Sequence, residues 1–158
     1  HMIAFEAEEY KRIRLKEMAE INKVQDRLTI GGLCSTDNLR DALKDQKNVL
    51  IVCDIEGGER DLLDPVEIPD LLRATLLVEL HDVFPEFADV PSVMRERFGK
   101  SHDIREVVGC DRTLKDLPFS VPYLFRKFYW PRLMARMDEK RPQNMHWYVM
   151  KPLSKSYN

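Results

Sequence analysis

The sequence contains no apolar run long enough to cross a bilayer, and it has no large excess of charge of either sign. Its longest wholly apolar runs, at 49–53 and 76–78, are far shorter than the roughly 20 residues that a membrane-spanning helix needs. With 25 lysines and arginines against 27 aspartates and glutamates, the formal net charge is -2 and the pI is about 6.1. Such a balanced chain has no global positive field to attract phosphate backbones or anionic lipid. We therefore expect a protein that neither spans a membrane nor binds nucleic acid.

Cysteine is also scarce. The three cysteines, Cys34, Cys53 and Cys110, lack the CxxC spacing of zinc and redox sites. We expect reduced, buried thiols in a cytoplasmic protein, and no structural zinc. The 158 residues are 44% hydrophobic and 33% charged, without an internal repeat or a low-complexity linker. These values predict a single globular domain over 3–158, and residues 1–2 look like the remnant of a cleaved expression tag.

Strand and helix patterns alternate along the chain. Runs typical of strands occur at 3–5, 28–33, 49–55, 75–80, 104–108 and 146–150. Helical patterns occur between them, at 8–24, 35–43, 65–74 and 93–98. This alternation predicts an α/β fold with a doubly wound, mostly parallel, Rossmann-like sheet and flanking helices. The run 49–55 is nearly all apolar and β-branched, which indicates a central strand covered on both faces.

The segment 110–143 has no strand pattern and is rich in aromatic and basic residues. We interpret it as a helical insertion before the last strand. An amphipathic packing helix with solvated charges is the commonest explanation of such a segment. The alternatives are a lid over an acidic or sugar-like acceptor and a surface that binds a partner.

Polar side chains follow several predicted strands at the point where each strand ends. In chain order they are Glu6, Cys34, Asp54, Glu56, His81 and Asp82. In doubly wound sheets, ligands bind beyond the carboxyl ends of the strands, where the loops of neighbouring strands meet. We therefore expect these side chains to share one edge of the sheet, around a ligand.

Four segments in this order resemble class I S-adenosylmethionine-dependent methyltransferases. They are IAFEAE at 3–8, DRL at 26–28, CDIEGGE at 53–59 and LVELHD at 77–82. The FkbM-like O-methyltransferases are the group they resemble most. The resemblance covers roughly 3–109 and the final strand, and its force lies in the order of the segments rather than in any one of them.

The resemblance implies S-adenosylmethionine as the cofactor and assigns residues to it. The implied cofactor-binding residues are Glu6, Ala7, Leu33, Cys34, Asp54 and Glu56. Glu6 would accept hydrogen bonds from the ribose hydroxyls, because a carboxylate can accept two neighbouring hydroxyl protons at once. Leu33 and Cys34 would lie against the adenine. Asp54 and Glu56 would face the methionine moiety and the transferred methyl group.

The implied reaction is transfer of the methyl group to a hydroxyl of a small molecule or glycan. The hydroxyl must lose its proton, so the site needs a positioned base. His81 is the best candidate for this base, because imidazole changes its protonation near neutral pH. Asp82 is the candidate that orients His81, or else it points into water.

The sequence departs from the family at its start. The family's first strand and its glycine-rich loop should precede residue 3, and neither pattern is present. We therefore expect an N-terminally truncated domain with impaired function. Because the first strand pairs with two neighbours in this fold family, its loss should split the sheet and leave open edges, which favour a homo-oligomer.

Each candidate site residue also has a plainer explanation. Glu6 suits the positive end of the helix that follows it, and His81 suits a structural histidine at a strand end. A divalent metal site for Mg²⁺ or Mn²⁺ would draw on the acids and imidazole at 54–59 and 81–82. We prefer to assign no metal. Without one, we expect Glu59 to be a solvated residue in the first turn of a helix.

Two other functions remain open. The first is a non-catalytic interaction or assembly module that is built on a methyltransferase-like fold and binds no cofactor. The second is a metal-dependent hydrolase that uses Asp54, Glu56 and His81.

Overall fold

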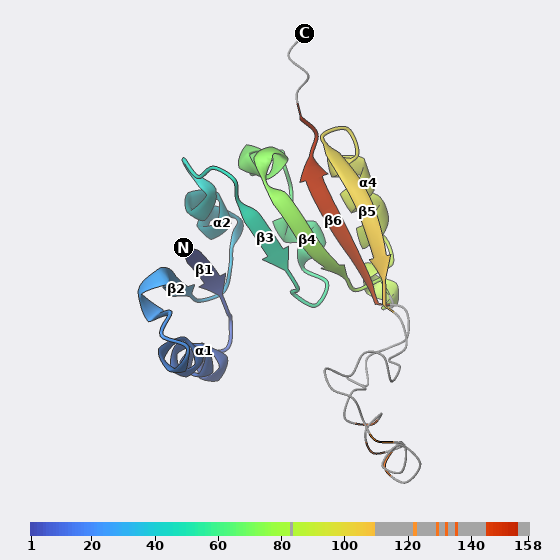
Figure 1. Cartoon of the computed structure of the whole chain (residues 1–158). Coiled ribbons are helices and arrows are strands. Elements are labelled where there is room, and N and C mark those ends of the chain that lie inside the picture. Colours follow the sequence, from blue (N-terminus) through green and yellow to red (C-terminus); the bar gives the residue numbers. More distant parts are fainter. Residues whose placement is uncertain are drawn as a thin grey trace.

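The strands of the chain form two separate sheets (Figure 1). The computed structural model describes residues 1–82, 84–109 and 145–154, together with four single residues, 122, 129, 132 and 135. The smaller sheet pairs β1 (Met2–Phe5) with β2 (Leu28–Gly31) in parallel. The larger sheet has the order β3 (Leu50–Cys53), β4 (Thr75–Leu80), β6 (His146–Pro152) and β5 (His102–Val108). All six predicted strands are therefore present.

The larger sheet is mixed rather than mostly parallel. β3 and β4 pair in parallel, with Leu50 beside Thr75 and Cys53 beside Val78. β6 lies between β4 and β5 and pairs antiparallel with both. The prediction of a mostly parallel sheet is therefore not confirmed. The prediction that β3 is central is wrong, because β6 takes the place beside β4 and β3 lies at the edge of the described sheet.

Four α-helices connect the strands in the described residues. They are α1 (Glu9–Ile21), α2 (Thr36–Leu43), α3 (Glu59–Leu62) and α4 (Val90–Phe98). Ser35 caps α2, because its hydroxyl accepts the backbone N–H of Asn38 in a capping box. The predicted helix at 65–74 is wrong in extent, because only a 3₁₀ turn, η2 (Pro69–Arg73), forms there. Proline at its first position fixes the backbone at the start of this turn.

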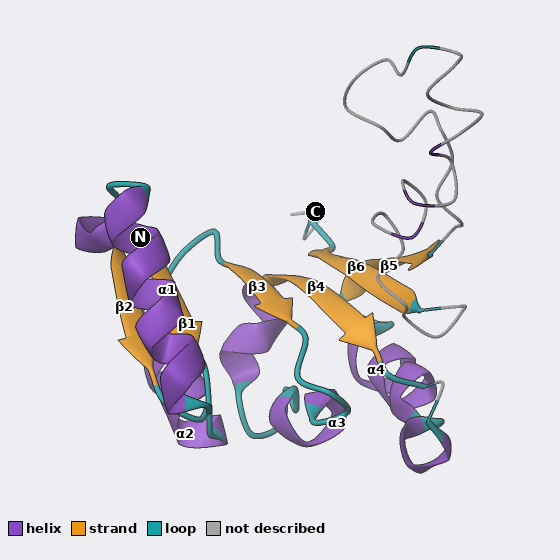
Figure 2. Cartoon of the chain, turned by 90° about the horizontal axis from the view of Figure 1, so that it is seen from below, coloured by secondary structure: helices purple, strands orange, loops and turns teal. Residues whose placement is uncertain are grey.

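The hydrophobic core lies against one face of the larger sheet. Figure 2 shows α3 and α4 on the same side of this sheet. Leu76, Val78 and Leu80 of β4 are fully buried on that face, as are Met94 and Phe98 of α4. Burial stabilises the fold by about 1.5–3 kcal/mol for each such side chain. This core fixes the position of the loops that follow β3 and β4.

Apolar side chains are exposed on β1 and β3, which lie at sheet edges. Leu50 and Val52 of β3 are each 61% exposed, so the prediction that this strand is covered on both faces is wrong. Met2 and Ile3 of β1 are 63% and 43% exposed. In the described residues β1 pairs only with β2, and β3 only with β4. The arrows of β1 and β3 point toward the same side of the molecule in Figure 1.

The predicted insertion at 110–143 lies outside the described residues, apart from the four single positions within it. Cys110 lies outside them as well. Among the described helices none is both long enough and apolar enough to cross a membrane.

Candidate functional site

His81 is a buried imidazole at the carboxyl end of β4. It follows Leu80 directly and is 2% exposed. Its Nδ1 lies 2.9 Å from Oε1 of Glu59, which belongs to the first turn of α3. Glu59 is 0% exposed, so the prediction that it is a solvated helix residue is wrong. The carboxylate of Glu59 is turned inward, where it accepts hydrogen bonds from the protein.

The hydrogen bonds of Glu59 decide which nitrogen of His81 donates. Oε1 of Glu59 also accepts the backbone N–H of Ile55, at 3.2 Å. Because Oε1 acts as an acceptor, we assign the Nδ1 proton of His81 to the bond with Glu59. The second ring nitrogen, Nε2, is left to face the loop that follows β3.

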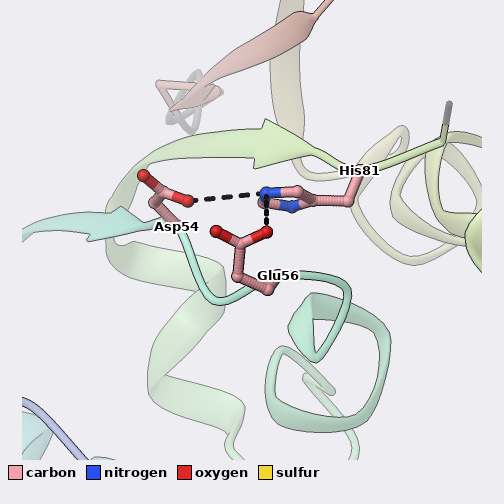
Figure 3. Close-up of side chains that lie close together, drawn as sticks. All are labelled: Asp54, Glu56 and His81. Atoms are coloured by element: carbon pink, nitrogen blue, oxygen red, sulfur yellow. Dashed lines mark ion pairs between the residues drawn. The ribbon is translucent and has the colours of Figure 1, made fainter. Parts of the chain in front are cut away.

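Two further carboxylates face Nε2 of His81 (Figure 3). Nε2 lies 3.5 Å from Oδ1 of Asp54 and 3.4 Å from Oε2 of Glu56. Both contacts are long for a hydrogen bond, and Nε2 makes no hydrogen bond to any described residue. The loop after β3 and the end of β4 thus bring three carboxylates around one imidazole, as the sequence predicted for Asp54, Glu56 and His81.

The backbone of the loop after β3 turns sharply to place Glu56. Glu56 has a φ of 53° and Gly57 a φ of 97°, both in the left-handed region. A Cβ atom at Gly57 would lie 2.3 Å from the ring of Phe87, so only glycine fits at this position. The side chain of Glu56 remains 84% exposed while its carboxylate reaches His81.

In the part of the chain that the structure describes, this group of acids has no basic neighbour to neutralise it. Among the described residues, no lysine or arginine forms an ion pair with Asp54, Glu56 or Glu59. The second oxygen of Glu59, Oε2, is buried and has no hydrogen-bond partner in that part of the chain. The site therefore carries concentrated negative charge around His81.

Asp82 does not orient His81 in this structure. Its Oδ1 is buried without a hydrogen-bond partner among the described residues, and no hydrogen bond or ion pair joins it to His81 there. Glu59 makes the orienting contact instead. The sequence offered one signal for Glu59, which was its position in the same block as Asp54 and Glu56. It did not show that the side chain of Glu59 turns inward.

The candidate residues of the smaller sheet lie apart from this group. Glu6 follows β1, and its Oε1 accepts the backbone N–H of Glu8 at 2.8 Å, just before α1. The backbone carbonyls of Glu6 and Ala7 accept hydrogen bonds from Arg12, at 2.8 and 2.6 Å. The hydrogen bond to Glu8 supports the plainer explanation of Glu6 as a residue at the start of a helix. The Glu6 carboxylate can still accept further hydrogen bonds.

Leu33 and Cys34 follow β2. Leu33 is 74% exposed, whereas Cys34 is half-buried and packs against the core. Burial raises the pKa of the Cys34 thiol above its ordinary value. In the described residues no hydrogen bond or ion pair links Leu33 or Cys34 to the acids around His81. Figure 1 shows β1, β3 and β4 directed toward the same side of the molecule, so Glu6, Asp54 and His81 follow strands that end on that side.

Comparison with solved structures identifies the class of fold. The chain is similar to the crystal structure of a putative precorrin-6Y C5,15-methyltransferase targeted domain from Corynebacterium diphtheriae, with a TM-score of 0.50 and 15% sequence identity. The match covers 96% of this chain and 72% of that chain. No protein-family model matches the sequence, and no curated protein matches it. The chain thus shares an α/β fold with that domain.

Proposed function

We propose that the chain is an S-adenosylmethionine-dependent O-methyltransferase-like domain, FkbM-like and extending over 3–158. The acceptor would be a hydroxyl of a small molecule or glycan, and we place the domain in the cytoplasm. One observation carries this proposal: on a methyltransferase-type fold, a buried imidazole and two carboxylates meet at the carboxyl ends of two adjacent parallel strands. This is the edge at which such folds bind their ligands.

The residues assigned to S-adenosylmethionine have a chemistry that fits it. The cofactor would supply a methyl group activated on a positively charged sulfur. Asp54 and Glu56 are 42% and 84% exposed in their side chains, so both carboxylates are accessible to a cationic ligand. Leu33 is exposed and offers an apolar surface for an aromatic ring. Glu6, Ala7 and Cys34, which follow β1 and β2, would bind the ribose and adenine parts.

His81 would act as the base for the acceptor hydroxyl. Its Nδ1 proton is held by Glu59, which fixes the tautomer that leaves Nε2 as the proton acceptor. The imidazolium formed in this step would lie beside three carboxylates, whose charge stabilises it. Glu59 is therefore the positioning residue in this proposal, in place of Asp82.

The open edges of β1 and β3 support the proposal that the domain is truncated. The resemblance places one further parallel strand, followed by a glycine-rich turn, between these two edges. Such a strand would cover Ile3 and Leu50, which are exposed here. It would also join the two sheets and fix the cofactor-binding residues of β1 and β2 relative to those of β3 and β4. Without it, we expect weak cofactor binding.

Calorimetric titration with S-adenosylmethionine tests this proposal. The chain should be compared with a form that carries an added strand and glycine-rich turn before residue 3, and the longer form should bind more tightly. In that form Glu6→Ala should weaken binding by roughly tenfold or more, because hydrogen bonds to a charged group contribute about 1.5–3 kcal/mol. Glu9→Ala, an exposed acid in the first turn of α1, is the matched control and should leave affinity unchanged. Unchanged affinity in Glu6→Ala would remove Glu6 from the site, and absence of binding by both forms would contradict the proposal.

The open apolar edges also favour a second candidate, a non-catalytic assembly module. Exposed sheet edges are templates for pairing with another chain. A homo-oligomer built through β1 or β3 would bury Ile3 or Val52, which are 43% and 61% exposed. A concentration-dependent increase in mass by sedimentation, without binding of S-adenosylmethionine by either form, would favour this module over the enzyme.

A further inference from the structure

We propose that Oδ1 of Asp54, Oε2 of Glu56 and Nε2 of His81 together bind one divalent transition-metal cation. This inference goes beyond the proposed function, because it holds whether or not the domain transfers methyl groups. The three ligand atoms all lie within 4.8 Å of one another. They come from the loop after β3 and from the residue that follows β4 (Figure 3).

The spacing of the ligand atoms suits a small cation. Two ligands about 2.1 Å from a tetrahedral metal lie roughly 3.4 Å apart. Nε2 of His81 lies 3.4 Å from the Glu56 oxygen and 3.5 Å from the Asp54 oxygen. Because these two distances already suit a bound metal, the buried His81 would bind a cation without a large movement. The exposed carboxylate of Glu56 has room to adjust.

The buried nitrogen of His81 points independently to a cation. Its ring is 2% exposed, and Nε2 makes no hydrogen bond to a described residue although two carboxylates face it. When Nδ1 donates to Glu59, the neutral ring turns the lone pair of Nε2 toward these carboxylates. A positive charge between Nε2 and the two carboxylates, either a proton on the ring or a metal ion, relieves the repulsion among these groups. A metal ion at this position would satisfy all three atoms.

Glu59 supplies the outer contact that metal-binding histidines usually have. A histidine that binds a metal through one nitrogen commonly donates its other N–H to a carboxylate, which fixes the ring and raises its basicity. The bond of 2.9 Å from Nδ1 to the fully buried Glu59 has this form. No basic side chain in the described chain pairs with these acids, so the cation would also balance their charge.

The ligand set indicates which cation binds. One imidazole with two carboxylates favours Zn²⁺ or Mn²⁺ over Ca²⁺ and Mg²⁺, which prefer oxygen ligands alone. Because Glu56 is 84% exposed, the open side of the site leaves room for water or an oxygen ligand. A cation and a proton compete for the same lone pair of Nε2. The loaded site therefore does not offer His81 as a base, so cation binding and base catalysis by His81 exclude one another, and the cation site is tested without cofactor or acceptor.

Titration of the whole chain with Zn²⁺, after treatment with a chelator and without S-adenosylmethionine, tests the proposal. We expect one site, with affinity reduced tenfold or more by Asp54→Asn and by Glu56→Gln. The matched controls Asp61→Asn and Glu67→Gln change acids with exposed side chains elsewhere and should bind as the unaltered chain does. His1→Gln and His146→Gln test the two other accessible imidazoles and should also have no effect. Far-UV circular dichroism would establish that each variant is folded.

Mn²⁺ bound to the unaltered chain provides a second readout that needs no variant. Pulsed electron paramagnetic resonance should show coupling to one imidazole nitrogen, from His81. The proposal is overturned if Zn²⁺ does not bind, if the Asp54 and Glu56 variants bind as tightly as the controls, or if bound Mn²⁺ shows no nitrogen coupling. Because no cofactor or acceptor is present, none of these outcomes depends on whether the domain is a methyltransferase.

Discussion

The buried pair of Glu59 and His81 makes a prediction about stability that can be worked from its contacts. In Glu59→Ala, the Nδ1 proton of His81 and the backbone N–H of Ile55 both lose their acceptor. A buried donor without a partner costs about 1–3 kcal/mol, and the part-buried N–H of Ile55 lies at the low end of this range, so the two together cost about 2–4 kcal/mol. Removal of the unpartnered Oε2 of Glu59 offsets about 1–3 kcal/mol of this loss. We expect the free energy of unfolding to fall by about 1 kcal/mol.

Two further variants separate the hydrogen bonds from the charge. Glu59→Gln keeps an oxygen that accepts from both donors, so it should destabilise the fold by less than Glu59→Ala. Glu56→Ala changes the same residue type in the same loop, but at a side chain that is 84% exposed. It should alter the free energy of unfolding by less than about 0.5 kcal/mol.

Urea unfolding followed by far-UV circular dichroism measures these differences. The urea midpoint should be highest for Glu56→Ala, lower for Glu59→Gln and lowest for Glu59→Ala. The dependence of the free energy of unfolding on urea concentration should stay constant. If Glu59→Ala is as stable as Glu56→Ala, the inward bonds of Glu59 do not stabilise the fold and the assignment of the Nδ1 proton fails.

Three other measurements test the packing and titration of the described residues. Gly57→Ala should lower the free energy of unfolding by more than about 2 kcal/mol, because the φ of Gly57 is 97° and the ring of Phe87 blocks the Cβ position. Gly32→Ala is the control, because a Cβ atom there meets no neighbour within 4 Å. Equal thermal midpoints for the two variants would contradict this prediction. Burial lowers the pKa of His102 below 6.5, so the unfolded chain takes up the proton first and stability should fall as pH drops from about 6.5 to the folded value. Urea unfolding of His102→Gln should show a flatter pH dependence over this window, and an unchanged slope would refute the assignment. Burial raises the pKa of Cys53 to about 12, so iodoacetamide at pH 8 should modify the half-buried Cys34 first; equal rates by peptide mass spectrometry would count against this.

Local patterns in the sequence predicted the elements that depend on neighbouring residues alone. The predicted strand at 75–80 has the same bounds as β4, because its alternate positions are buried and its β-branched and apolar residues suit a strand. The helix predicted at 8–24 is shorter in the structure, where α1 ends at Ile21 before a turn with Lys23 at a φ of 56°. The six strands were thus identified, with errors mainly at their ends.

Long-range pairing could not be predicted in the same way. Nothing local to β3 indicates that β6, which follows it by more than 90 residues in the sequence, takes an inner position in the sheet. The same limit applies to Glu59, whose burial depends on His81 at the end of another strand. A single acid after two glycines is compatible with solvent or with an inward bond, and only the fold decides between them.

The two parts of the candidate site depend on the fold to different extents. Asp54, Glu56 and Glu59 lie between β3 and β4, and His81 follows β4 directly; these two strands pair within one sheet. Glu6 and Leu33 follow β1 and β2, which form no strand pairing with that sheet in the described residues. Cation binding needs only the first group, whereas a ligand as long as a nucleoside with an amino-acid tail needs both groups at a fixed separation. Addition of a strand between β1 and β3 should therefore strengthen cofactor binding while leaving the affinity for Zn²⁺ within about twofold, a difference well below 1 kcal/mol.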